Sequence, residues 1–100
     1  MTDTIESILE QAQVWQHQQQ FRQAIGCLYK VLDIDPNHIE ALHQLGLIYI
    51  QTDDINQAVT VLEQVVKHDP NNPNAHHHLA NAYKLNNRLT EADKEFQITL

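Results

Sequence analysis

Apolar residues recur along this chain at spacings of three and four, which is the pattern of one buried face of an α-helix. The first such stretch runs from Ile5 to about Gln18, and five more begin near Phe21, His38, Ile55, Pro73 and Leu89. The pattern predicts six helices of roughly 12 to 14 residues, joined by turns of about two to four residues. We therefore expect an all-α protein.

Proline and asparagine mark the predicted helix boundaries. Residues 35–37 read Asp-Pro-Asn and end the second helix, because proline disfavours a helical residue before it and cannot continue the hydrogen-bond ladder. Asn37, with Glu40 three residues later, predicts a capping box for the third helix. Asn72 followed by Pro73 predicts an N-cap and a first-turn proline for the fifth.

The helices are related by a repeat of 34 residues. The middle unit carries the clearest landmarks: Leu42, Leu45, Gly46, Tyr49, Ala58, Leu62, Val65 and Pro70. One repeat upstream stand Ile8, Ala12, Trp15, Ala24, Leu28, Val31 and Pro36; one repeat downstream stand His76, Leu79, Ala80, Tyr83, Ala92, Phe96 and Thr99. The period predicts a single domain over residues 1–100, with repeats at 5–38, 39–72 and 73–100, the last one truncated.

A 34-residue helix-turn-helix unit closed by Asp-Pro-Asn resembles the tetratricopeptide repeat, and the match covers Ile5 to Leu100. The resemblance implies an α-solenoid of three antiparallel helix hairpins wound into a right-handed superhelix. Where the family often has a turn glycine, this chain has Gln19, Asp53 and Asn87, and aspartate and asparagine tolerate a left-handed backbone better than glutamine does.

The resemblance also implies a function, because this family binds extended peptides or helices on the inner face of the first helix of each repeat. The residues carried over are Glu6, Leu9, Gln13 and Gln16; Glu40, His43, Leu47 and Ile50; and Asn74, His77, Asn81 and Lys84. We expect the partner contacts to be Leu9, Gln13, Gln16, His43, Leu47, Ile50, His77, Asn81 and Lys84. The predicted function is a protein-protein interaction module for a peptide or helix.

Leu47 and Ile50 are the most informative of these residues. The stretch from Leu45 to Ile50 supplies more apolar side chains than one packing face absorbs, which favours two of them facing the groove. The alternative is that both pack against neighbouring inner helices.

The third repeat stops at Leu100 without its Asp-Pro, and solenoids usually need a polar cap at each end. We therefore expect Leu89, Phe96 and Leu100 to be partly open to solvent. This leaves a second function open, in which the chain is an assembly protein that homodimerises through this end. A third is an N-terminal scaffold fragment of a longer enzyme.

Composition narrows the functional classes. The net charge is -7 and the six lysines and arginines are scattered, which gives no footprint for nucleic acid. The N-terminus lacks a signal-peptide pattern and no stretch approaches the roughly 20 apolar residues of a membrane span, so we expect a cytoplasmic protein. Phosphate loops, nucleophile elbows and paired-histidine helices are missing from the sequence, so we expect neither enzyme activity nor a cofactor.

The single cysteine and the seven histidines are candidate metal ligands. Cys27 alone makes neither a disulfide nor a cysteine-based zinc site, and a buried structural thiol is favoured. Residues 76–78 are all histidine, but successive helix residues point about 100° apart and do not converge on one ion. His43 and His77 occupy equivalent groove positions, where polar lining is favoured over a metal site. A pH response of the groove is a further hypothesis.

Overall fold

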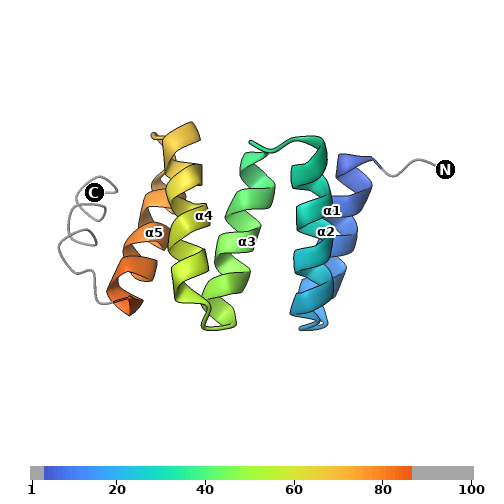
Figure 1. Ribbon diagram of the computed structural model, residues 1–100, viewed down its shortest axis with the longest axis horizontal. Coiled ribbons are helices and arrows are strands. Elements are labelled where there is room, and N and C mark those ends of the chain that lie inside the picture. The colour runs from blue at the N-terminus through green and yellow to red at the C-terminus, as the bar shows by residue number, and fades with distance from the viewer. Residues whose placement is uncertain (1–3, 87–100) are drawn as a thin grey trace.

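The computed structural model describes residues 4–86 (Figure 1). They form five helices: α1 (Ile5–His17), α2 (Phe21–Ile34), α3 (Ile39–Gln51), α4 (Ile55–His68) and α5 (Pro73–Leu85). These bounds agree with the first five predicted helices, and the all-helical class is confirmed for the described residues. The predicted sixth helix, with Leu89, Phe96 and Leu100, lies outside them.

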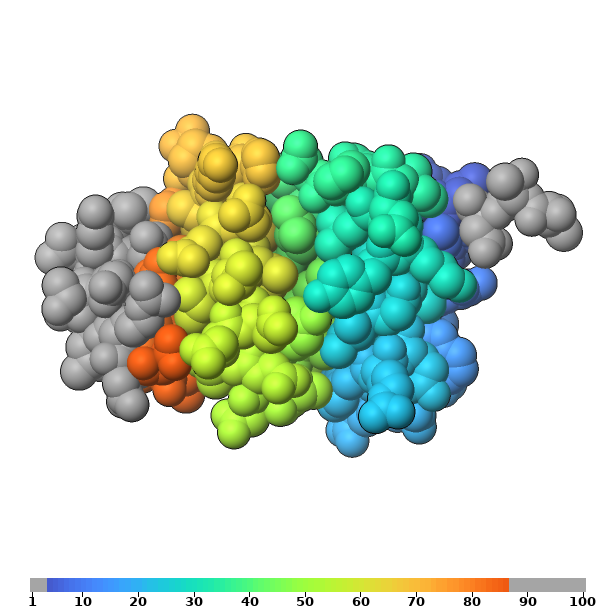
Figure 2. Space-filling model, viewed as in Figure 1, coloured from blue at the N-terminus to red at the C-terminus, as the bar shows by residue number. Residues whose placement is uncertain are grey.

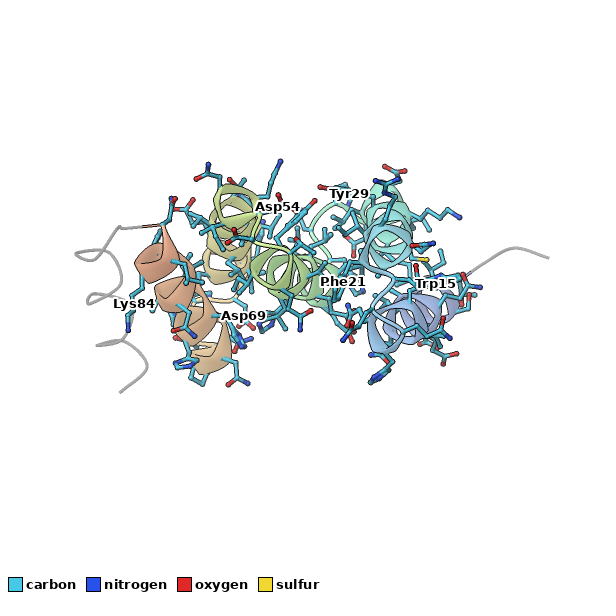
Figure 3. All side chains as sticks on the ribbon, turned by 90° about the horizontal axis from the view of Figure 1, so that it is seen from below. Trp15, Phe21, Tyr29, Asp54, Asp69 and Lys84 are labelled. Carbon is cyan, nitrogen blue, oxygen red and sulfur yellow. The ribbon has the colours of Figure 1, made fainter. Side chains whose placement is uncertain are left out.

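The helices stand side by side in chain order (Figure 1). α1 packs on α2 and α3 packs on α4, while α2 also contacts α3 and α4 also contacts α5. Figure 3 shows α2 and α4 on one side of the row and α1 and α5 on the other, with α3 between them. Figure 2 views the face on which α2 and α4 lie. This arrangement is an α-solenoid, as predicted.

One hydrophobic core runs through all five helices. Repeat landmarks occupy its centre, because Leu28, Leu45 and Leu62 are fully buried and Leu79 is nearly so. Full burial of one such side chain stabilises the fold by about 1.5 to 3 kcal/mol. None of the helices within residues 4–86 is long and apolar enough to cross a membrane.

The predicted N-cap is confirmed for α5 and wrong for α3. Thr4 and Ser7 form a capping box at the start of α1, and Asn72 Oδ1 accepts a hydrogen bond from the Ala75 amide at 3.2 Å. The prediction that Asn37 caps α3 was wrong. His38 is the N-cap, and its Nδ1 accepts from the Ala41 amide at 3.2 Å.

The turns within the first two hairpins use a left-handed residue. Gln19 has a φ of 58° and Asp53 a φ of 64°. Both residues stand where the tetratricopeptide repeat often has glycine. The sequence favoured a left-handed backbone at Asp53 over Gln19, and the structure has one at both. The third position, Asn87, lies outside the described residues.

Candidate functional site

The predicted contact residues gather mainly between α3 and α5. A hollow of about 430 Å³ opens there, lined by Leu47, Ile50, Gln51, His78, Asn81, Lys84 and Leu85. Four of these belong to the predicted set: Leu47, Ile50, Asn81 and Lys84. The hollow therefore draws its walls from the second and third repeats.

Helical spacing explains why α3 supplies the apolar wall. Leu45 and Ile48 are 0 % and 1 % exposed and face the core, whereas Leu47 and Ile50 are half-buried and line the hollow. Two apolar stripes therefore share one helix, as the surplus of apolar residues predicted. The alternative, that Leu47 and Ile50 pack against neighbouring helices, is partly correct for Ile50, which also packs against the hydrophobic core.

The opposite wall comes from the last turns of α5. Asn81 and Lys84 are three residues apart on one helical stripe, and Leu85 follows with 58 % of its surface exposed. Lys84 is the charged residue of the lining, and Figure 3 places it at the end of the molecule opposite Trp15. An apolar floor with amide, imidazole and ammonium groups around it suits an apolar side chain next to hydrogen-bond acceptors.

His43 of α3 meets His78 of α5. His43 Nε2 lies 3.0 Å from His78 Nδ1, and the two rings meet edge to face with centroids 5.0 Å apart. His77 is exposed, with its ring centroid 5.9 Å from that of His78. Successive residues of a helix point about 100° apart, so His77 and His78 face different directions. His78 is the half-buried one whose Nδ1 meets His43 of α3.

Burial depresses the basicity of this histidine pair. It lowers the pKa of His43, and the nearby charge of His78 lowers it further. Burial likewise lowers the pKa of His78, and the charge of His77 adds to that effect, while a hydrogen bond with the Asn74 backbone acts in the opposite direction. Both imidazoles are thus harder to protonate than a free histidine, and neutral rings face the groove at pH 7.

The contacts predicted in the first repeat are dispersed. Leu9 is 8 % exposed and belongs to the hydrophobic core, so it is a core residue rather than a surface contact. Gln13 is exposed. Gln16 Nε2 donates to Gln44 Oε1 at 3.3 Å, which ties α1 to α3.

Three lining residues escaped the sequence prediction: Gln51, His78 and Leu85. His78 carries a usable signal, because it lies one repeat after Gln44, which contacts Gln16 across the preceding pair of inner helices. Gln51 and Leu85 are likewise one repeat apart at the last turns of their helices.

The described residues contain no group of three or more His, Cys, Asp or Glu placed to hold a metal ion. Cys27 is buried among apolar side chains, in agreement with a structural thiol. His76, one of the three consecutive histidines, is 3 % exposed and its Nε2 lies 2.6 Å from the Pro70 carbonyl oxygen. It anchors the turn before α5 and does not line the hollow.

Solved structures of MamA share this fold. The crystal structure of MamA has a TM-score of 0.90 and 20% identity, over 96% of this chain and 56% of that one. MamA MSR-1 C2 has a TM-score of 0.86 and 26% identity, over 98% and 56%. MamA 41-end from Desulfovibrio magneticus RS-1 has a TM-score of 0.90 and 24% identity, over 96% and 54%. The present chain thus spans a little over half the length of these structures.

Sequence comparison identifies the family directly. No curated protein matches the chain in sequence. The family model of the tetratricopeptide repeat, however, matches residues 16–76 and again residues 53–99, well over half of the chain. The chain belongs to the tetratricopeptide repeat family.

Proposed function

We propose that this protein is an interaction module that binds a peptide or helical segment of another protein along the inner face of α1, α3 and α5. Tetratricopeptide repeats serve in general as protein-interaction domains, which supports the broad function. The observation that carries the specific proposal is the hollow between α3 and α5. It presents Leu47 and Ile50 on an inner helix, outside the stripe that forms the core.

The energetics favour an apolar anchor in that hollow. Burial of one leucine-sized or phenylalanine-sized side chain is worth about 1.5 to 3 kcal/mol. The lining is held by packed helices, so the ligand, not the protein, loses most of the conformational entropy on binding. Asn81, His78 and Lys84 at the rim then orient the ligand backbone and favour a segment with a carboxylate near the anchor.

Beyond the hollow, the proposed surface continues along the inner helices. His43 and His77 extend it toward the start of α5, and Gln13 and Gln16 extend it onto α1. The proposed module is one domain with repeats at 5–38, 39–72 and 73–100. It forms a right-handed superhelix of three hairpins and acts in the cytoplasm.

Peptide selection followed by NMR mapping tests the proposal. A random peptide library displayed on phage is selected against the immobilised protein, and the enriched peptides are titrated into isotope-labelled protein. We expect enrichment of peptides with an apolar anchor, and the largest amide shift changes at Leu47, Ile50 and Asn81. Shift changes concentrated on the outer face of α2 and α4 would refute the groove as the binding site.

A further inference from the structure

One face of α1 exposes apolar surface that the other inner helices bury. Val14 is 53 % exposed, whereas the residues one and two repeats later, Ile48 and Ala82, are 1 % and 0 % exposed. Gln11, Val14 and Trp15 together line a second hollow of about 370 Å³. This repeat position is apolar in all three inner helices. It is buried in α3 and α5 and exposed in α1.

Packing in the other repeats shows what normally covers this position. α2 packs on α3 and α4 packs on α5, so each outer helix bridges its own inner helix and the next one. α1 has no helix before it in residues 4–86. Its open face is therefore one half of the interface that α2 and α4 complete for α3 and α5.

A hydrogen bond that recurs between outer and inner helices indicates which residues would cover the open face of α1. Tyr29 Oη of α2 lies 2.7 Å from Tyr49 Oη of α3, and Tyr83 Oη of α5 donates to Glu63 Oε2 of α4, also at 2.7 Å. The second pair is the first shifted by 34 residues at both ends. In each case a side chain of the outer helix meets the aromatic residue of the next inner helix.

Continued one repeat further in each direction, the same pattern reaches Trp15 at the inner-helix position and Gln97 at the outer-helix position. Trp15 stands one repeat before Tyr49, and Gln97 stands one repeat after Glu63. An indole N–H is a donor only, and a glutamine side-chain carbonyl is an acceptor, so the two are chemically matched. Within residues 4–86 the structure shows no side-chain hydrogen bond of Trp15, which lines the second hollow with part of its ring exposed.

We propose that the open face of α1 binds residues 89–100 of a second copy of this chain, so that copies associate head to tail. Residues 89–100 repeat positions of α4: Leu89 stands one repeat after Ile55, Ala92 after Ala58 and Phe96 after Leu62. The open face of α1 and residues 89–100 thus match the two halves of one internal interface.

Such a contact joins different surfaces on the two copies. Because it continues the stacking of the repeats, it adds copies in an open row. It is weaker than the interior contacts, because Thr99 stands where Val31 and Val65 are fully buried, and Glu95 stands where α4 has Val61. We expect reversible association that depends on protein concentration. This surface is separate from the groove, so neither proposal depends on the other.

Sedimentation and fluorescence of the full chain test this directly. Over about a hundredfold range of concentration we expect the average mass to rise. The emission of Trp15, the single tryptophan, should shift to shorter wavelength over the same range as its indole leaves water. Val14→Glu places a carboxylate in the contact and should weaken association at least tenfold. Gln57→Glu adds the same charge at an exposed position of α4 and should associate as the parent does.

A mixing experiment separates head-to-tail contact from pairing of two C-terminal ends. Val14→Glu retains its C-terminal residues, so it can add to one end of a parent row and block further growth; adding it to the parent should lower the average mass. If two C-terminal ends pair instead, Val14→Glu alone is as dimeric as the parent. That result, or a parent that stays monomeric with constant Trp15 emission, would overturn the proposal.

Discussion

At the scale of single residues, Gly46 sets how closely α3 approaches α4. A Cβ at this position would lie 2.6 Å from both Cγ and Cδ2 of Leu62, far inside normal contact. Leu62 is fully buried, and a close-packed core gives it little room to move. Gly26 in α2 is the opposite case, because a Cβ there would meet nothing within 4 Å.

Replacing each glycine by alanine should therefore change the free energy of unfolding in opposite directions. Gly46→Ala should lower the free energy of unfolding by about 1 to 3 kcal/mol through overpacking, which outweighs the better helix propensity of alanine. Gly26→Ala should raise it by about 0.5 to 1 kcal/mol, since only the propensity changes. Urea unfolding followed by circular dichroism measures both. Stabilisation by both substitutions would show that α3 and α4 are not as close as described.

The contact between His43 and His78 makes the stability of the protein depend on pH. Its hydrogen bond needs one imidazole as donor and one bare nitrogen as acceptor. Burial, above all, lowers the pKa of both rings, so the unfolded chain takes up protons first as the pH falls. The stability contributed by the neutral pair is therefore complete above about pH 6.5 and is lost as the pH falls toward the folded pKa values.

We expect His78→Gln to flatten this dependence. Glutamine is the residue one repeat earlier, at Gln44, so the position accommodates it. Between about pH 7.5 and pH 5.5 the Tm of the parent should fall by more than the Tm of the variant, because the variant has lost one of the two depressed histidines. Differential scanning fluorimetry at matched ionic strength gives the comparison. Equal slopes for the two proteins would exclude the pair as a source of acid sensitivity.

At the scale of elements, the start of α3 shows why local motifs can mislead. Asn37 and Glu40 have the spacing of a capping box, yet Glu40 Oε1 accepts from Gln44 Nε2 at 3.3 Å instead. The turn after Pro36 is closed by the His38 amide, which donates to the Asp35 carbonyl oxygen at 3.1 Å. That turn starts the helix at Ile39, so His38 takes the capping position. Asn37 and His38 both carry a side-chain acceptor, and the backbone turn determines that His38 is the N-cap.

The caps of α5 and α3 supply a matched pair of substitutions. Asn72→Ala removes the acceptor for the Ala75 amide and should destabilise the protein by about 1 kcal/mol. Asn37→Ala changes an exposed residue whose side chain caps nothing, and its effect should stay within about 0.5 kcal/mol. Thermal unfolding of both variants gives the test. A larger loss from Asn37→Ala than from Asn72→Ala would reverse the assignment of the caps.

At the scale of the whole molecule, the row of helices was predictable because the apolar period and the 34-residue repeat agree. The site was predictable only in part. Leu47 and Ile50 stood out as surplus apolar residues, but which histidine faces α3 depends on how α3 and α5 cross, and local sequence does not encode that. Leu9 shows the same limit. It is buried in α1, whereas His43, which occupies the same repeat position in α3, is only half-buried.

The measurement closest to the central claim is the affinity of the Leu47→Ser, Ile50→Ser double variant for a peptide selected on the parent protein. Fluorescence anisotropy gives the affinity, and circular dichroism confirms that helicity is kept. We predict that binding is abolished, whereas the control Ile34→Ser, which removes a 58 % exposed apolar residue of α2, binds as the parent does. A folded double variant with unchanged affinity would contradict the assignment of the binding site to the hollow between α3 and α5.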